Sequence, residues 1–307
     1  MATITHAISP EDCAAMAELR KAAANITVTF DPASRPMLDE MLSHTPPAPG
    51  VTSEAATVGG VPGYWVRPTD VLPNAAILYL HGGAYNVGSA GAFRNFVGQI
   101  ATRAGVAAFA AEYRLAPEHP FPAAVNDVMA AYHGVINEGF TEIAIVGDSA
   151  GGGLTLVTLA QAIEMTRDAG EIQPRCAVVM SPWTDLSLSG ASITERALAD
   201  PFLKHDSIAA ASARYLNGHD ARDPLASPLF GGLTGLPPIR IHVGEDEILL
   251  DDSRRYAKRA TAEGVEIELH IWEGMPHVFP SNVGTFAASE IALDDIGAFL
   301  RQHLSSL

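Results

Sequence analysis

Short apolar runs and longer segments with apolar residues at helical spacing alternate along most of the chain after residue 50. The short runs are rich in Ile, Val, Leu and Ala and are bounded by turn residues, which is typical of buried strands. We expect strands at residues 55–58, 64–67, 75–80, 106–113, 143–146, 177–180, 239–243 and 267–271, and helices at 123–137, 150–167, 249–263 and 287–304. Strands that alternate with helices in this way predict a largely parallel sheet covered by helices on both faces.

Two stretches depart from this alternation. Residues 1–50 hold two helical patches and no strand signal, and they end in a Pro-rich linker. Residues 186–225 hold two helical patches where a single crossover helix would be expected. We therefore predict a core made of residues 51–185 and 226–307, and a helical cap made of the N-terminal residues 1–50 and the insertion 186–225.

The composition narrows the class of protein. The chain has 307 residues, of which 48% are hydrophobic, so it is long enough for a substantial core. A formal net charge of −16 argues against nucleic acid as a partner, because little positive charge is available to neutralise phosphates. Two cysteines, Cys13 and Cys176, do not suggest a disulfide framework. With neither a signal-peptide pattern nor an apolar stretch of membrane-spanning length, we expect a cytoplasmic protein without a membrane span.

The most informative stretch is residues 142–153. An apolar run leads into Gly147-Asp148-Ser149-Ala150-Gly151, and a long Ala-rich segment follows at once, so the pattern predicts a strand, a sharp turn and a helix. Ser149 would lie at the tip of that turn, beside the free N–H groups of the helix start. The same motif also occurs at ordinary strand–helix turns. Ser149 is therefore a candidate nucleophile only if a base, an acid and an oxyanion-binding loop lie elsewhere in the chain.

His277 is the best-placed base. It lies in a Gly- and Pro-containing loop directly after the apolar run 267–271, where a strand's carboxyl end is expected. For the acid we choose Asp246, just past the end of the expected strand 239–243, with Asp251 as the alternative. An acidic residue at this position is also a common helix cap. The order Ser149, Asp246, His277 matches the Ser…Asp…His order of α/β-hydrolases.

A Gly-rich turn supplies the fourth part of the site. His81-Gly82-Gly83 directly follows the expected buried strand 75–80. The N–H groups of Gly82 and Gly83, together with that of Ala150, are expected to form an oxyanion hole. A plain turn would explain the two glycines by themselves, but not their coincidence with the other three features.

Taken together, these motifs resemble those of the bacterial hormone-sensitive-lipase-type esterases. The resemblance is carried by His81-Gly82-Gly83-Ala84, Tyr113-Arg114-Leu115-Ala116-Pro117-Glu118, Gly147-Asp148-Ser149-Ala150-Gly151-Gly152, the Asp246 segment and Met275-Pro276-His277. It covers nearly the whole chain beyond residue 50. It implies an α/β-hydrolase fold with about eight strands and a helical cap, and hydrolysis of short-chain carboxylic esters without a cofactor or a metal. The family motif usually has Gly where this chain has Ala84.

Several questions stay open from the sequence. The substrate could equally be a lactone or an amide, because the same triad serves all of these, and a non-catalytic small-molecule receptor is the alternative outside enzymes. Tyr85, Phe202 and Leu203 are candidates for lining the substrate pocket, although each is equally compatible with the core. We expect a small-molecule ester as the partner, and a homodimer remains open.

Overall fold

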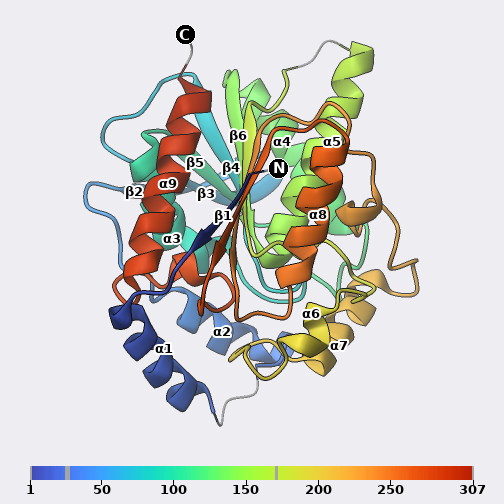
Figure 1. Ribbon diagram of the computed structural model, residues 1–307. Coiled ribbons are helices and arrows are strands. Elements are labelled where there is room, and N and C mark those ends of the chain that lie inside the picture. Colours follow the sequence, from blue (N-terminus) through green and yellow to red (C-terminus); the bar gives the residue numbers. More distant parts are fainter. Residues whose placement is uncertain (1, 25–27, 170–171, 306–307) are drawn as a thin grey trace.

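The protein is built on one nine-stranded sheet with helices on both faces (Figure 1). The computed structural model describes residues 2–24, 28–169 and 172–305. The strands are β1 (Ala2–His6), β2 (Thr52–Val58), β3 (Val61–Arg67), β4 (Ala75–Leu80), β5 (Ala107–Ala111), β6 (Glu142–Asp148), β7 (Cys176–Met180), β8 (Ile239–Gly244) and β9 (Ile267–Trp272). They lie in the order β1-β9-β8-β7-β6-β4-β5-β3-β2.

All neighbouring strands are parallel except at one edge, where β3 runs antiparallel to both β2 and β5. The central strands β4 to β7 are buried along their whole length. This is why their sequences are continuous apolar runs without alternation. The predicted α/β-hydrolase sheet is confirmed, with nine strands where about eight were expected.

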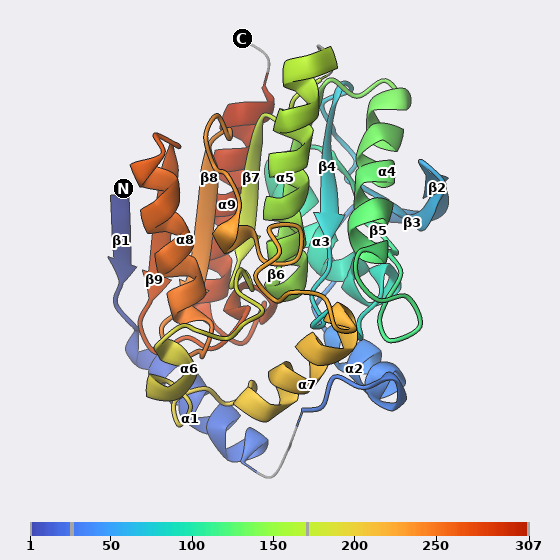
Figure 2. The same cartoon turned by 90° about the vertical axis from the view of Figure 1, so that its right-hand side faces the viewer.

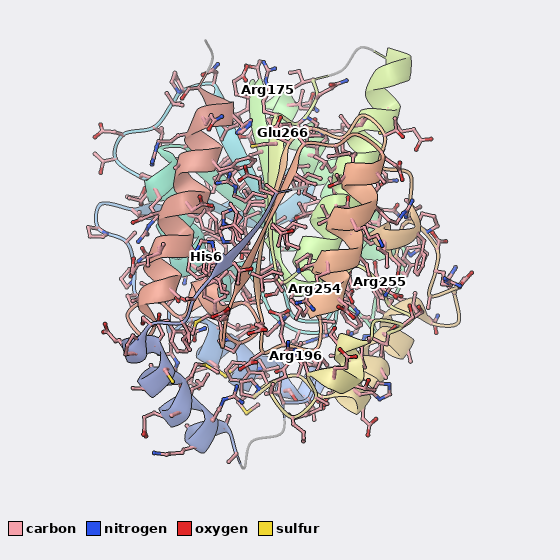
Figure 3. All side chains as sticks on the ribbon, viewed as in Figure 1. His6, Arg175, Arg196, Arg254, Arg255 and Glu266 are labelled. Carbon is pink, nitrogen blue, oxygen red and sulfur yellow. The ribbon has the colours of Figure 1, made fainter. Side chains whose placement is uncertain are left out.

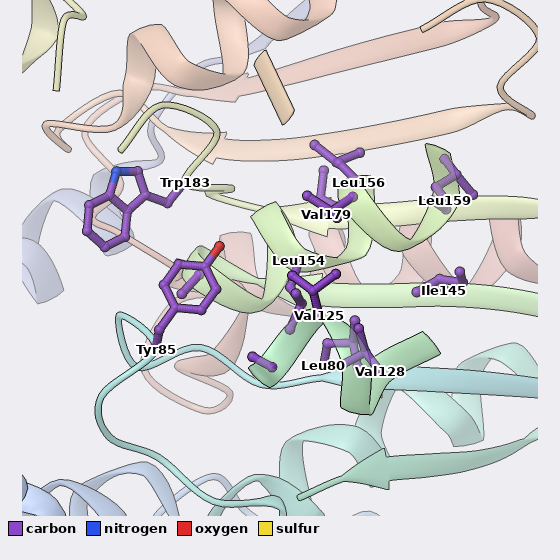
Figure 4. Close-up of a cluster of buried hydrophobic side chains, with 14 of the residues drawn as sticks. Leu80, Tyr85, Val125, Val128, Ile145, Leu154, Leu156, Leu159, Val179 and Trp183 are labelled. Carbon is purple, nitrogen blue, oxygen red and sulfur yellow. The ribbon is translucent and has the colours of Figure 1, made fainter. Parts of the chain in front are cut away.

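Helices form a layer on each side of the sheet (Figure 1). Helices α3 (Ala90–Ala104) and α9 (Ala287–Leu304) cover one face, and α4 (Ala123–Asn137), α5 (Ser149–Ala169) and α8 (Leu250–Ala262) cover the other. Figure 4 shows part of the second interface, where Val125 of α4 and Leu154 of α5 pack near Ile145 of β6. The two layers bury both sides of the parallel sheet, as the alternating pattern requires.

A third group of helices lies at the carboxyl ends of the parallel strands (Figure 2). It consists of α1 (Pro10–Ala23), α2 (Arg35–Leu42), α6 (Ser192–Glu195) and α7 (His205–Leu216). We call these four helices the helical layer. Three short 3₁₀ segments complete the described elements: η1 (Pro32–Ser34), η2 (Pro228–Phe230) and η3 (Phe279–Ser281). Residues from the first part of the chain and from the 186–225 insertion thus lie together over the end of the sheet where sites form in α/β folds.

The N-terminal stretch contains a strand that the sequence pattern did not predict. β1 pairs in parallel with β9, so that Ile4 lies opposite His270 and His6 opposite Trp272. Its first four residues are exposed, and it therefore has no apolar face from which it could be recognised. Its position depends on its neighbour, because His6 Nε2 lies 3.0 Å from His270 Nδ1 and the His6 ring stacks on Trp272.

Candidate active site

Ser149 lies at the sharp turn between β6 and α5. Its backbone φ of 52° is in the left-handed region, which residues other than glycine rarely occupy. The turn is possible because the flanking residues lack side chains. A Cβ on Gly147 would lie 2.4 Å from Gly151 O, and one on Gly151 would lie 2.1 Å from Leu80 O. The sequence motif therefore encodes a close approach of helix and strand that holds Ser149 at the carboxyl edge of the sheet.

His277 connects this serine to a buried acid. His277 Nε2 lies 2.9 Å from Ser149 Oγ, and His277 Nδ1 lies 3.1 Å from Oε1 of Glu247. Because the carboxylate can only accept, the hydrogen of a neutral ring is on Nδ1, and Nε2 is free to accept the hydroxyl proton of Ser149. Three side chains separated widely along the chain thus meet as a nucleophile, a base and an orienting acid.

Glu247 is held rigidly in this position. Its side chain is fully buried, and Oε2 accepts hydrogen bonds from Ser181 Oγ at 2.6 Å and from the Gly244 N–H at 3.1 Å. Burial by itself would lower the pKa of His277, but the charge and hydrogen bond of Glu247 outweigh it and raise that pKa above 6.5. The acid therefore stabilises the imidazolium that proton transfer would create.

The prediction that Asp246 faces His277 is wrong. Asp246 Oδ2 instead accepts from Arg20 of α1 at 2.7 Å, and Oδ1 lies 3.8 Å from Arg196. The chain turns just after β8, so the neighbouring side chains point in different directions, and Glu247 takes the inward position. The alternative, Asp251, is also engaged elsewhere, because it accepts from the Ser192 N–H. Figure 3 places Arg196 beneath the sheet, next to α6.

The loop after β4 is fixed by the residue that precedes the nucleophile. The carboxylate of Asp148 accepts the Gly82 N–H at 3.0 Å and the Tyr79 hydroxyl at 2.6 Å. The N–H of Gly82 is therefore already used, which corrects the expectation that it is free for an oxyanion. Gly83 lines the cavity above Ser149. Burial raises the pKa of Asp148 to about 6, against the effect of its hydrogen bonds.

His81 supports this loop from below. Its Nδ1 lies 2.7 Å from Gly82 O, and its ring stacks on Tyr113. Burial lowers the pKa of His81 to about 4, so the ring is neutral at pH 7 and Nδ1–H donates to the carbonyl. This contact shapes the loop, and it offers no proton to the site.

An apolar cavity of about 270 Å³ opens onto Ser149 and His277. The helical layer and the segments joined to it supply one wall, and helix α3 and the loops of the core supply the other. Phe202 and Leu203 line the cavity, as predicted, but Tyr85 does not. Tyr85 is buried, and its ring stacks on that of Tyr215 of α7 with 3.9 Å between the ring centroids. Figure 4 shows Tyr85 beside Trp183. The remaining apolar lining comes mainly from Val28, Phe30, Leu38, Met41, Leu42, Val87, Phe93, Phe96 and Val278.

Another polar cluster lies near the β1 edge of the sheet, where one atom each from His242, His270 and Asp295 comes within 4.8 Å of the others. Such a set has the residue types of a metal site. However, Trp272 Nε1–H donates to His242 Nδ1, so the hydrogen of a neutral His242 is on Nε2 and points to Asp295. Arg240 also pairs with Asp295. The donor set therefore fits a hydrogen-bonded network better than a cation.

Ser149, His277 and Glu247 thus have the arrangement of a serine-hydrolase triad, and comparison with known proteins identifies the α/β-hydrolase fold on which they lie. Residues 77–281 match the family model described as alpha/beta hydrolase fold. The chain is 40% identical over 250 residues to "Acetyl-hydrolase" of Streptomyces hygroscopicus, covering 81% of this chain and 82% of that protein. It is 32% identical to "Esterase" of Acinetobacter venetianus over 270 residues, with 87% and 88% covered.

Solved structures give the same result. An esterase from the bacterial hormone-sensitive lipase (HSL) family matches with a TM-score of 0.88 and 38% identity, covering 98% of this chain and all of the other. A hormone-sensitive lipase from a metagenome library matches with a TM-score of 0.90 and 36% identity, covering 97% of this chain and all of the other. The chain therefore belongs to the bacterial HSL family of esterases within the α/β-hydrolase fold.

None of the helices in the described ranges is long and apolar enough to cross a membrane.

Proposed function

We propose that the protein is a carboxylesterase that hydrolyses short-chain carboxylic esters through an acyl-enzyme on Ser149. The observation that carries this proposal is the position of His277, between Ser149 Oγ at 2.9 Å and the Glu247 carboxylate at 3.1 Å, at the base of an apolar cavity. The relatives named "Acetyl-hydrolase" and "Esterase" support an ester substrate. The contacts of His277 with Ser149 and Glu247 favour an enzyme over the receptor alternative, because a receptor needs no such arrangement.

In the first half of the reaction, His277 Nε2 takes the Ser149 proton as Oγ attacks the ester carbonyl. The N–H groups of Gly83 and Ala150 hold the oxyanion, in agreement with the pairing of one loop donor with the residue after the nucleophile. The tetrahedral intermediate collapses, and the alcohol leaves with the proton that His277 returns. Glu247 accepts Nδ1–H throughout and stabilises the imidazolium.

In the second half, a water molecule attacks the acyl-serine. His277 takes a proton from the water and then returns it to Ser149 as the carboxylic acid is released. Each group ends in its starting state, so the cycle needs no additional reactant.

The size of the cavity supports the proposed preference for short acyl chains. Its volume of about 270 Å³ lies just below the usual range of small-molecule sites, which begins at about 300 Å³. One of its walls comes from the helical layer and adjoining segments, and we propose that these form a cap over the ester. An acyl group of a few carbons would be enclosed, whereas a long chain would have to displace side chains such as Phe202 or Leu203.

The experiment compares Ser149→Ala with the wild type on p-nitrophenyl esters of increasing acyl length. We expect Ser149→Ala to lose activity by at least about 10³-fold and to lose labelling by a fluorophosphonate, while Ser53→Ala on the exposed strand β2 keeps both. Wild-type activity should be highest on the short esters. Full activity of Ser149→Ala would refute the nucleophile, and a preference for long chains would refute the substrate class.

A further inference from the structure

The loop that carries Gly83 adopts an unfavourable backbone conformation. Ala84 and Tyr85 have φ values of 53° and 62°, so two successive residues with side chains occupy the left-handed region. The carbonyl of Gly83 accepts the N–H groups of Asn86 and Val87, each at 3.0 Å, and this closes a tight turn. Such strain persists only where surrounding contacts stabilise it.

Asn86 provides two of those contacts. Its side chain is completely buried, and Nδ2 donates to Ala84 O at 2.6 Å and to Ala211 O at 3.0 Å. Both partners are carbonyl oxygens, which can only accept, so the NH₂ group of the amide must face them. One side chain thus joins the strained turn of the oxyanion loop to the backbone of helix α7.

The same loop contacts the helical layer at two further points. The Tyr85 ring stacks on Tyr215 of α7, with the ring planes 7° apart. Arg35 of α2 donates from Nε to Asn86 O at 2.9 Å, and from Nη2 to Ala116 O at 2.9 Å. Ala116 N–H in turn donates to Tyr85 O. The conformation of the loop therefore depends on where the helical layer lies, and Asn86 is the buried polar link.

We propose that Asn86 is a positioning residue that couples the docking of α7 to the alignment of the oxyanion loop. It does not line the cavity, and its side-chain hydrogen bonds go to Ala84 O and Ala211 O and not to the triad. It acts through the turn at Ala84 and Tyr85, which sets the direction of the preceding Gly83 N–H. The proposal rests on the proposed function, because Gly83 matters in this way only if an oxyanion forms beside Ser149. Loss of the link would weaken stabilisation of the transition state more than binding of the ester.

The experiment compares Asn86→Leu, which has a similar shape and no donors, with the wild type on a short p-nitrophenyl ester. We expect kcat to fall on the order of 10- to 100-fold, less than the full loss of an oxyanion donor, with KM changed less than about threefold. The inhibition constant of a trifluoromethyl ketone, whose adduct with Ser149 carries an oxyanion, should rise by a similar factor. Ser212→Ala is the matched control, since it removes an α7 hydrogen bond to Leu186 O and leaves the loop untouched.

Asn86→Ser serves as a second variant in case Asn86→Leu does not fold. Its short hydroxyl cannot bridge both carbonyls, so kcat should again fall by more than in Ser212→Ala. A folded Asn86 variant with wild-type kcat, or with a change confined to KM, would overturn the proposal. A wild-type protein without ester hydrolysis or fluorophosphonate labelling would instead refute the proposed function, so the two failures are distinguishable.

Discussion

Glu247 determines both the tautomer and the charge preference of His277. Its carboxylate accepts Nδ1–H at 3.1 Å and is itself held by Ser181 and the Gly244 N–H. In a glutamine at this position the amide oxygen would have to face the Gly244 N–H, so its NH₂ group would face His277 Nδ1 and hold the imidazole hydrogen on Nε2, the wrong nitrogen for accepting the Ser149 proton. The role of the acid is thus one of orientation and electrostatic stabilisation.

We therefore expect Glu247→Gln to lower kcat/KM by about 10³- to 10⁴-fold on a p-nitrophenyl ester. Asp246→Asn is the matched control, because it changes the adjacent acid in the same way but touches only the Arg20 and Arg196 pairs. Its kcat/KM should stay within about threefold of the wild type, as expected for partly exposed ion pairs. Equal losses in the two variants would contradict the assignment of Glu247.

Asp246 and Glu247 also show how much of the candidate site the sequence could predict. Ser149, His277 and the Gly-rich loop were predictable, because each is tied to a strand end by a local motif. The acid was not, because Glu245, Asp246 and Glu247 are consecutive at the end of one strand. Their spacing to His277 is almost identical, and only the turn after β8, which spacing does not encode, decides which side chain points inward.

At the scale of elements, a buried carboxylate fixes the wall of the cavity. Asp200 follows α6 and is almost fully buried. Its Oδ1 accepts the N–H groups of Phe202 and Leu203, both at 2.8 Å, and its Oδ2 accepts the Ile248 N–H at 2.9 Å. The insertion is thereby joined to the residue directly after Glu247, so the wall and the acid are held together.

Asp200→Ala should consequently release the wall and lower stability. Three N–H groups would lose their acceptor, and each of the two buried ones, of Leu203 and Ile248, costs about 1–3 kcal/mol when left unpaired. We expect the free energy of unfolding in urea to fall by more than about 2 kcal/mol and KM for short esters to rise. Asp206→Ala, on the exposed surface of α7, should change neither. If the two variants unfold at the same urea concentration, Asp200 does not anchor the insertion.

Two elements escaped prediction, for different reasons. β1 has an exposed pattern and is defined by its partner strand, and α3 was not among the expected helices although Ser89 and Gly105 cap it. The apolar residues of α3 do follow helical spacing, with Phe93, Phe96 and Ile100 on one face and polar residues between them, so this helix was predictable and the prediction missed it. β1 depends on its pairing with a strand distant in the sequence, whereas α3 carries its signals locally.

For the whole molecule, buried histidines and buried carboxyl groups make the stability depend on pH in opposite directions. Burial lowers the pKa of His81 to about 4, and it also lowers those of His242 and His270. Burial raises the pKa of Asp148 to about 6 and that of Asp252 to about 8. In the range between about 4 and 6.5, the unfolded chain binds more protons at the histidines and the folded chain binds more at the carboxyl groups. The two sets therefore offset one another.

Removing one histidine and removing one carboxyl group should change the pH dependence of stability in opposite directions. The stability that His81 contributes is present above pH 6.5 and is lost as the pH falls toward about 4. His81→Gln should therefore gain stability relative to the wild type on acidification, by on the order of 3 kcal/mol at about 1.4 kcal/mol per pKa unit. For Asp148 the folded pKa is the higher one, so the wild type gains stability as the pH falls below about 6. Asp148→Asn should accordingly lose stability relative to the wild type as the pH falls below about 6.

Urea unfolding of the three proteins at pH 7, 6, 5 and 4.5 measures these differences directly. Each variant carries a constant cost from its altered hydrogen bonds, so the diagnostic quantity is the slope of the variant-minus-wild-type difference against pH. Slopes of opposite sign would establish that a buried neutral histidine beneath the oxyanion loop and a buried carboxyl group beside the nucleophile offset each other. A flat difference for either variant would show that its group titrates alike in the folded and unfolded chains, and slopes of the same sign would show that one of the two pKa shifts has the opposite direction.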